Sequence, residues 1–114
     1  MSIRRGEVYL AALNPTVGSE IAKTRPTVIV SNDINNTYAN TVTIVPLTSL
    51  SGGEVHPYEV FIPKGEGGLP KDSKVKASQI RTIDKKRLIK RLGALKEDLI
   101  GRIEEAVKIH LDLP

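Results

Sequence analysis

Short apolar runs, alternating or β-branched, occupy the first 80 residues and predict a chain built mainly of strands. In segment 7–13 (EVYLAAL) both alternating faces are apolar, so this strand is expected in the middle of a sheet. Further strands are expected at 27–31, 41–47, 58–62 and 74–80, with loops at 14–24, 32–40, 49–57 and 63–73. Pro46 cannot donate to a ladder, which predicts that its strand is exposed or bulged at that point.

The pattern becomes helical near the C-terminus. From about Glu97, apolar residues such as Leu99 and Ile103 recur at three- and four-residue spacing, which predicts an amphipathic helix. Gly101 inside it is expected to mark a close approach of another backbone, and His110 to pack half-buried on its apolar face. The fold class is therefore mainly β with a C-terminal α-helix, a small barrel of five or more short, mostly antiparallel strands.

Two segments between the strands and the helix are harder to assign. Asp84 is expected to cap a short turn in the sequence DKKRL. Segment 88–95 (LIKRLGAL) fits a helix or a strand equally well, and Gly93 weakens the helix.

Composition narrows the function classes. A length of 114 residues fits one domain, 1–114. The absence of cysteine excludes disulfides, thiol nucleophiles and cysteine zinc sites, and two histidines leave little for a metal site, so no metal or cofactor is expected. No apolar run is long enough to span a bilayer and no signal peptide is seen, so a cytoplasmic location and no membrane partner are expected.

The charge distribution indicates a polyanionic partner. The net charge is +4, and ten basic residues but only two acidic ones fall between Lys71 and Lys96. A solvated basic face explains this run equally well. The few aromatic residues argue against a single-strand binder built on stacking platforms.

Individual residues allow several chemistries. Arg25 directly precedes Pro26, which biases it toward extended backbone, and a guanidinium held there can bind a phosphate through two hydrogen bonds. The alternative is a surface ion pair, for example with Glu20. Thr48 ends a strand, where its hydroxyl either points into a cleft or bonds its own backbone. His56 and His110 invite a histidine-based ribonuclease, but a solvated His56 and a packed His110 are the simpler interpretation.

Three stretches, taken together, resemble one family. NPTVGSE with RPTVIVSND (14–20 and 25–33), TVTIVPLTS (41–49) and KVKASQIRTIDKKRL (74–88) are similar to the MazF/PemK toxins, the endoribonucleases of type II toxin–antitoxin pairs. The opening RRGEVYLAAL and the terminal helix fit as well, so the likeness covers nearly the whole chain.

The resemblance implies an SH3-like barrel of the CcdB/PemK type that acts as a homodimer. It implies sequence-specific, metal-independent cleavage of single-stranded mRNA, in which the 2′-hydroxyl attacks the phosphate and leaves a 2′,3′-cyclic phosphate and a 5′-hydroxyl. Arg25 and Thr48 match the family's catalytic Arg and Thr, and a guanidinium, which stays protonated, makes a poor general base. The base is left open between Glu20, His56 and water.

The same likeness implies the RNA contacts and a protein partner. Ser19 and Glu20 match a loop that lies over the RNA, Gln79 matches an RNA-contacting Gln, and Arg81 can guide phosphates. His56 is retained as a candidate RNA contact. The partner implied is a MazE-like antitoxin, whose acidic and apolar tail would wrap the toxin.

Two other classes compete with the ribonuclease. A gyrase-poisoning toxin resembling CcdB shares the barrel but acts by binding a protein. A catalytically silent RNA-binding barrel would keep the basic segment and bind RNA without needing Thr48. RNA cleavage in EDTA separates the ribonuclease from both.

Overall fold

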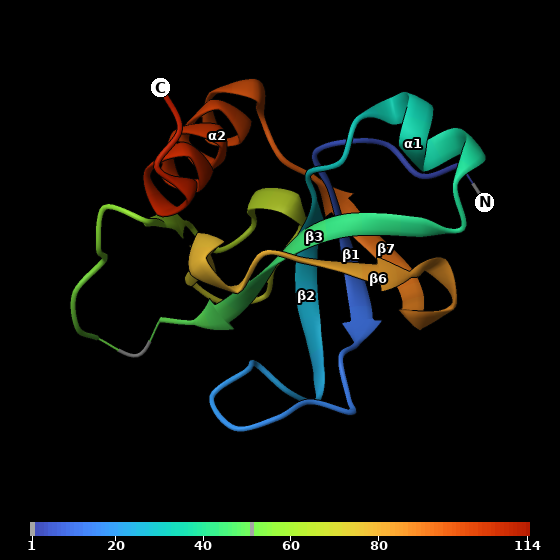
Figure 1. Cartoon of the computed structure of the whole chain (residues 1–114). Coiled ribbons are helices and arrows are strands. Elements are labelled where there is room, and N and C mark those ends of the chain that lie inside the picture. Colours follow the sequence, from blue (N-terminus) through green and yellow to red (C-terminus); the bar gives the residue numbers. More distant parts are fainter. Residues whose placement is uncertain (1, 51) are drawn as a thin grey trace.

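Seven antiparallel strands and a C-terminal helix dominate the computed structural model, which describes residues 2–50 and 52–114 (Figure 1). The predicted fold class, mainly β with a C-terminal helix, is confirmed. The strands are β1 (Glu7–Ala12), β2 (Thr24–Ile29), β3 (Thr41–Ser49), β4 (Glu59–Ile62), β5 (Ser73–Lys76), β6 (Arg81–Asp84) and β7 (Leu88–Ala94). The helices are α1 (Asp33–Tyr38) and α2 (Glu97–Leu111), with 3-10 turns η1 (Glu66–Gly68), η2 (Ala77–Gln79) and η3 (Lys85–Arg87).

The sheet is organised around the long strand β3. The strand order is β4-β5-β3-β2-β1-β7, and β6 pairs with a different part of β3. Along one edge β3 pairs with β2; along the other it pairs first with β6, over Thr41–Ile44, and then with β5, over Leu47–Ser49. In Figure 1 the loop between β1 and β2 projects from the end of the sheet opposite the two helices.

Pro46 lies in the interval between these two pairings. It is buried and sits opposite Thr27 of β2, so the expectation of an exposed or bulged strand is wrong. A residue without an amide proton is tolerated there because neither β6 nor β5 pairs with β3 at this point.

Two apolar clusters pack on the two faces of β1. Val8 belongs to the cluster that includes Leu99, Ile103 and Ala106 of α2, whereas Tyr9 belongs to a second cluster. This explains why both faces of the 7–13 segment are apolar. The central position predicted for this strand is confirmed, because β1 pairs with β2 on one side and β7 on the other.

Two segments differ from the sequence prediction, and a third, left open between helix and strand, is a strand. Residues 32–40, expected as a loop, contain α1, because the Asn32 side chain caps the helix by accepting the Asn35 N–H at 2.8 Å. The strand expected over 74–80 ends at Lys76 and continues as η2, and the unpredicted β6 follows. Segment 88–94 is a strand, since its pairing with β1 outweighs its helical propensity.

The turn at DKKRL and the terminal helix are confirmed, with the Asp84 side chain accepting the Lys86 N–H at 2.8 Å. Two details of the helix were wrong. A Cβ at Gly101 would meet nothing within 4 Å, so no other backbone approaches it among the described residues. His110 is exposed, as are Ile109 and Leu111, because the last turn of α2 lies beyond the part of the helix that packs on the core. Within the described ranges, no helix combines the length and apolarity needed to cross a membrane.

Glu59 is a buried carboxylate at the start of β4. It is 6% exposed and accepts hydrogen bonds from the Lys74 ammonium at 3.1 Å and the His56 N–H at 3.0 Å, with the Lys76 ammonium at 3.5 Å. Burial alone would raise the pKa of this carboxyl, but the His56 N–H and the two lysines outweigh it and lower the pKa below its ordinary value. The ionised carboxylate therefore stabilises the fold above the unfolded-state pKa of about 4.3, and this stabilisation is lost as the pH falls further.

We expect Glu59→Gln to lower the free energy of unfolding by about 2 kcal/mol at pH 7, because it leaves two lysines without their counter-charge. Urea unfolding from pH 7 down to pH 3 measures this, and the deficit should shrink progressively as the pH falls below the unfolded-state pKa, because the wild-type carboxyl then begins to lose its charge advantage. Glu54→Gln, an exposed carboxylate nearby, is the matched control. An equal deficit at both pH values would contradict the ionic role.

Candidate active site

A small cleft brings together the two residues that sequence analysis placed at the centre of catalysis. Thr27 of β2 pairs with Pro46 of β3, and continuing this register by two residues sets Arg25 opposite Thr48. Both line a cleft of about 70 Å³. Its other lining residues are Pro26, Leu47, Ser49, Leu69, Pro70, Lys71 and Ser73. A drug-sized ligand needs ~300–1,000 Å³, so this cleft suits a group as small as one phosphate.

Arg25 is positioned by β2 and by one backbone contact. It lies inside the strand opposite Ala11, not between loop and strand as the sequence suggested, and its Nε donates to the Ala22 carbonyl at 3.3 Å. No carboxylate of residues 2–50 and 52–114 lies within 4 Å of its guanidinium, so the ion pair with Glu20 is not formed. The two terminal nitrogens of a half-buried guanidinium are left to bind an anion.

Thr48 presents its hydroxyl from the end of β3. The residue is half-buried and pairs with Lys74 of β5. The alternative role, a hydroxyl bonded to its own backbone, is not observed among the described residues. Thr48 Oγ1 can therefore donate a hydrogen bond to an anion bound beside Arg25.

The loop between β1 and β2 is held at its base by two other predicted residues. Gln79 of η2 accepts the Ile21 N–H at 3.2 Å, and Arg81 of β6 donates to the Leu13 carbonyl at 3.3 Å. Neither lines the cleft, and the two hydrogen bonds tie the loop to η2 and β6. Ser19 and Glu20 lie exposed on this loop, where the Glu20 carboxylate accepts the Val17 N–H at 2.6 Å.

His56 is not one of the residues that line the cleft, and it lies on the segment between β3 and β4. Its ring is exposed and stacks on Tyr58 with centroids 5.3 Å apart. The structure thus brings Arg25 and Thr48 together, attaches Gln79 and Arg81 to the loop that carries Ser19 and Glu20, and keeps His56 separate.

Sequence reasoning missed Lys71 as a residue of the cleft. The segment before and at the start of β5 contributes Leu69, Pro70, Lys71 and Ser73 to the lining of the cleft that holds Arg25 and Thr48. The only signal in the sequence was that Lys71 belongs to the basic run, and nine other basic residues belong to it as well.

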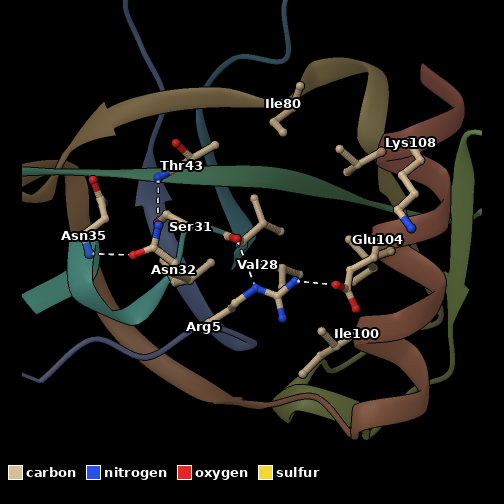
Figure 2. A pocket seen from close by; sticks show the side chains of 14 residues that line it. Arg5, Val28, Ser31, Asn32, Asn35, Thr43, Ile80, Ile100, Glu104 and Lys108 are labelled. Atoms are coloured by element: carbon tan, nitrogen blue, oxygen red, sulfur yellow. Dashed lines mark hydrogen bonds and ion pairs between the residues drawn. The ribbon is translucent and has the colours of Figure 1, made fainter. Parts of the chain in front are cut away.

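A larger pocket of about 540 Å³ lies between α2 and the segment joining β2 to α1 (Figure 2). Its polar groups bond to one another. The Arg5 guanidinium pairs with Glu104 at 3.2 Å and donates to the Val30 carbonyl at 3.2 Å, and Asn32 accepts the Asn35 N–H at 2.8 Å. Because its arginine is already paired with a carboxylate, this pocket is a poorer phosphate site than the Arg25 cleft.

Comparison with known proteins identifies the class to which this fold and cleft belong. Residues 4–111 match the family described as PemK-like, MazF-like toxin of type II toxin-antitoxin system, and the chain belongs to this family. The resemblance inferred from the sequence is confirmed. A gyrase-poisoning CcdB-like toxin is not favoured.

Individual relatives agree with this assignment. The chain is 39% identical to Endoribonuclease MazF9 of Mycobacterium tuberculosis, over 97% of this chain and 98% of the relative. Among solved structures, an endoribonuclease in complex with its cognate antitoxin from Mycobacterial species has a TM-score of 0.80 at 28% identity, covering 98% of this chain and 97% of the other. MazF from Deinococcus radiodurans has a TM-score of 0.85 at 22% identity, covering 99% of both chains, and shows the shared fold.

Proposed function

We propose that this toxin is an endoribonuclease that cleaves single-stranded mRNA at a short recognition sequence, without a metal ion, through Arg25 and Thr48. The observation that carries the proposal is the cleft itself. Arg25 and Thr48 both line a space as small as one phosphate, and among the described residues neither the terminal guanidinium nitrogens nor the hydroxyl has a hydrogen-bond partner. Family membership supports the same activity, since its 39% identical relative is named an endoribonuclease.

The reaction needs charge stabilisation more than a strong base. The 2′-oxygen attacks the phosphorus, the bond from phosphorus to the 5′-oxygen breaks, and the products are a 2′,3′-cyclic phosphate and a 5′-hydroxyl. Negative charge builds on the non-bridging oxygens, where the Arg25 guanidinium and the Thr48 hydroxyl donate hydrogen bonds. Each such donor is typically worth ~10²–10³ in rate.

Protons must leave the 2′-hydroxyl and reach the departing 5′-oxygen. Among residues 2–50 and 52–114, those that line the cleft include neither a histidine nor an acidic residue; Glu20 lies exposed on its loop and His56 on another segment. Water is therefore the proposed acceptor of the 2′-hydroxyl proton. Arg25 stabilises the phosphate and is the proposed proton donor to the 5′-oxygen, and it regains its proton from the solvent that accepted the 2′-hydroxyl proton.

The proposed ribonuclease function and the family membership also imply the binding partners. Ser19 and Glu20, on the β1–β2 loop, contact the RNA nucleotides that flank the phosphate in the cleft. Gln79 and Arg81 hold that loop in place through their hydrogen bonds to Ile21 and Leu13. The active toxin is a homodimer in the cytoplasm, and a MazE-like antitoxin inhibits it. One structural relative is an endoribonuclease solved with its cognate antitoxin, which supports the last point.

The test is cleavage of a long single-stranded RNA by the purified protein in EDTA, with the fragment ends mapped chemically. We expect discrete cuts that leave 2′,3′-cyclic phosphate and 5′-hydroxyl ends, and the cut sites would define the recognition sequence. Folded protein that leaves an RNA containing all short sequences intact would refute the proposal. RNA binding without cleavage would instead indicate the silent RNA-binding barrel.

A further inference from the structure

Most of the basic segment between Lys71 and Lys96 is engaged within the protein. Four of its ten basic residues pair with carboxylates: Lys74 and Lys76 with Glu59, Arg91 with Glu7, and Lys96 with Glu66. Three more donate to backbone carbonyls: Lys85 to Asn36, Arg81 to Leu13, and Arg87 to Ala12 and Asn14. Most basic side chains of this segment therefore form intramolecular ion pairs or hydrogen bonds, and only a few remain available to a ligand.

Three lysines of the run remain: Lys71, Lys86 and Lys90. All three side chains are exposed, and within residues 2–50 and 52–114 none has a carboxylate within 4 Å. Only Lys71 lines the cleft that holds Arg25 and Thr48. Its position, not its charge, separates it from the other two.

The backbone that carries Lys71 is fixed to the rest of the cleft. The Leu50 N–H, just after β3, donates to the Asp72 carbonyl at 3.0 Å, which joins the strand of Thr48 to the segment that carries Lys71. The Asp72 side chain accepts the Lys64 N–H at 2.8 Å, and the Ser73 hydroxyl donates to the Lys71 carbonyl at 2.9 Å. The lysine thus sits on a defined wall, with a flexible stem that can reach into the cleft.

We propose that Lys71 is a substrate-binding residue whose ammonium contacts the RNA phosphate held by Arg25 in the same cleft. The inference rests on the proposed ribonuclease function. Lys71 and Arg25 line the same cleft of about 70 Å³, so a phosphate bound there lies near both residues. The two groups contribute differently to phosphate binding. The guanidinium fixes the orientation of the phosphate through two hydrogen bonds, and the ammonium adds a compact positive charge.

The test is the salt dependence of RNA binding, measured on a Thr48→Val background so that the RNA stays intact. For single-stranded nucleic acid, each phosphate contact contributes about −0.7 to the slope of log affinity against log salt. We expect Lys71→Ala to reduce the slope by about 0.7 and to weaken binding roughly tenfold at low salt. Lys71→Arg should retain most of the slope. Lys90→Ala, an equally exposed and unpaired lysine on β7, is the control and should change neither quantity.

The outcomes separate this inference from the function on which it rests. A slope that falls for Lys71→Ala but not for Lys90→Ala supports the contact. An unchanged slope, or an equal fall in both variants, overturns it, even where the wild-type protein cleaves RNA. A wild-type protein that never cleaves RNA, together with a fall confined to Lys71→Ala, refutes the ribonuclease and leaves a phosphate-binding site.

Discussion

Arg25→Ala is expected to lower the rate of RNA cleavage by ~10²–10³, because it removes the main donor to the phosphate oxygens. Stability should change little. In the protein Arg25 makes one hydrogen bond, from Nε to the Ala22 carbonyl, and no ion pair with a described residue. Arg25→Lys should recover only part of the rate, since an ammonium cannot form two parallel hydrogen bonds. Fragment formation over time under single-turnover conditions measures these effects.

Thr48→Val is the matched change on the facing strand, since it keeps the branched shape and removes the hydroxyl. We expect a loss of similar size for this variant. The double variant should lose less than the product of the two single losses, because both groups act on one phosphate. Cleavage by Arg25→Ala at the wild-type rate would remove this cleft from the mechanism or reveal a contaminating nuclease, and unfolding in urea would show whether each variant is folded.

The strands that could be predicted are those in which local pattern and tertiary environment agree. Segment 7–13 is apolar on both faces because Val8 and Tyr9 enter different clusters. The spacing of Leu99 and Ile103 predicts α2 because both side chains pack in the cluster that includes Val8. The helix α1 could not be predicted in this way. Asn and Asp favour both loops and helix N-caps, and the choice at Asn32 also involves the distant Arg5 N–H, which donates to Asp33.

The candidate site shows a similar division. Residue types alone left Arg25 and Thr48 no better than a surface ion pair and a turn hydroxyl, and the family resemblance first singled them out. Their juxtaposition depends on the register of β2 with β3, which a single sequence does not state. The role of Lys71 could not be predicted from the sequence for another reason. Which lysines of a basic run are already paired is a property of the folded chain, since Glu59 is 15 residues from Lys74.

Gly93→Ala is expected to cause the largest loss of stability, because β7 and η1 touch backbone to backbone at this point. A Cβ at Gly93 would lie 2.6 Å from the Gly67 carbonyl carbon and 2.9 Å from the Gly68 nitrogen. Gly68 has a φ of 74°, and a Cβ there would collide with the Leu92 carbonyl in turn. Backbone atoms cannot rotate away as a side chain can, so the change should lower the free energy of unfolding by about 3 kcal/mol or more.

The urea midpoint measures this loss, and Gly101→Ala is the control with the same chemical change. A Cβ at Gly101 meets nothing within 4 Å, so alanine there should stabilise α2 by roughly 0.5–1 kcal/mol. The two variants should therefore shift the midpoint in opposite directions, and a stable Gly93→Ala protein would show that the β7–η1 contact is looser than described. Since η1 leads through Leu69 and Pro70 to Lys71, a displaced η1 should also weaken RNA binding, which Gly101→Ala should leave unchanged.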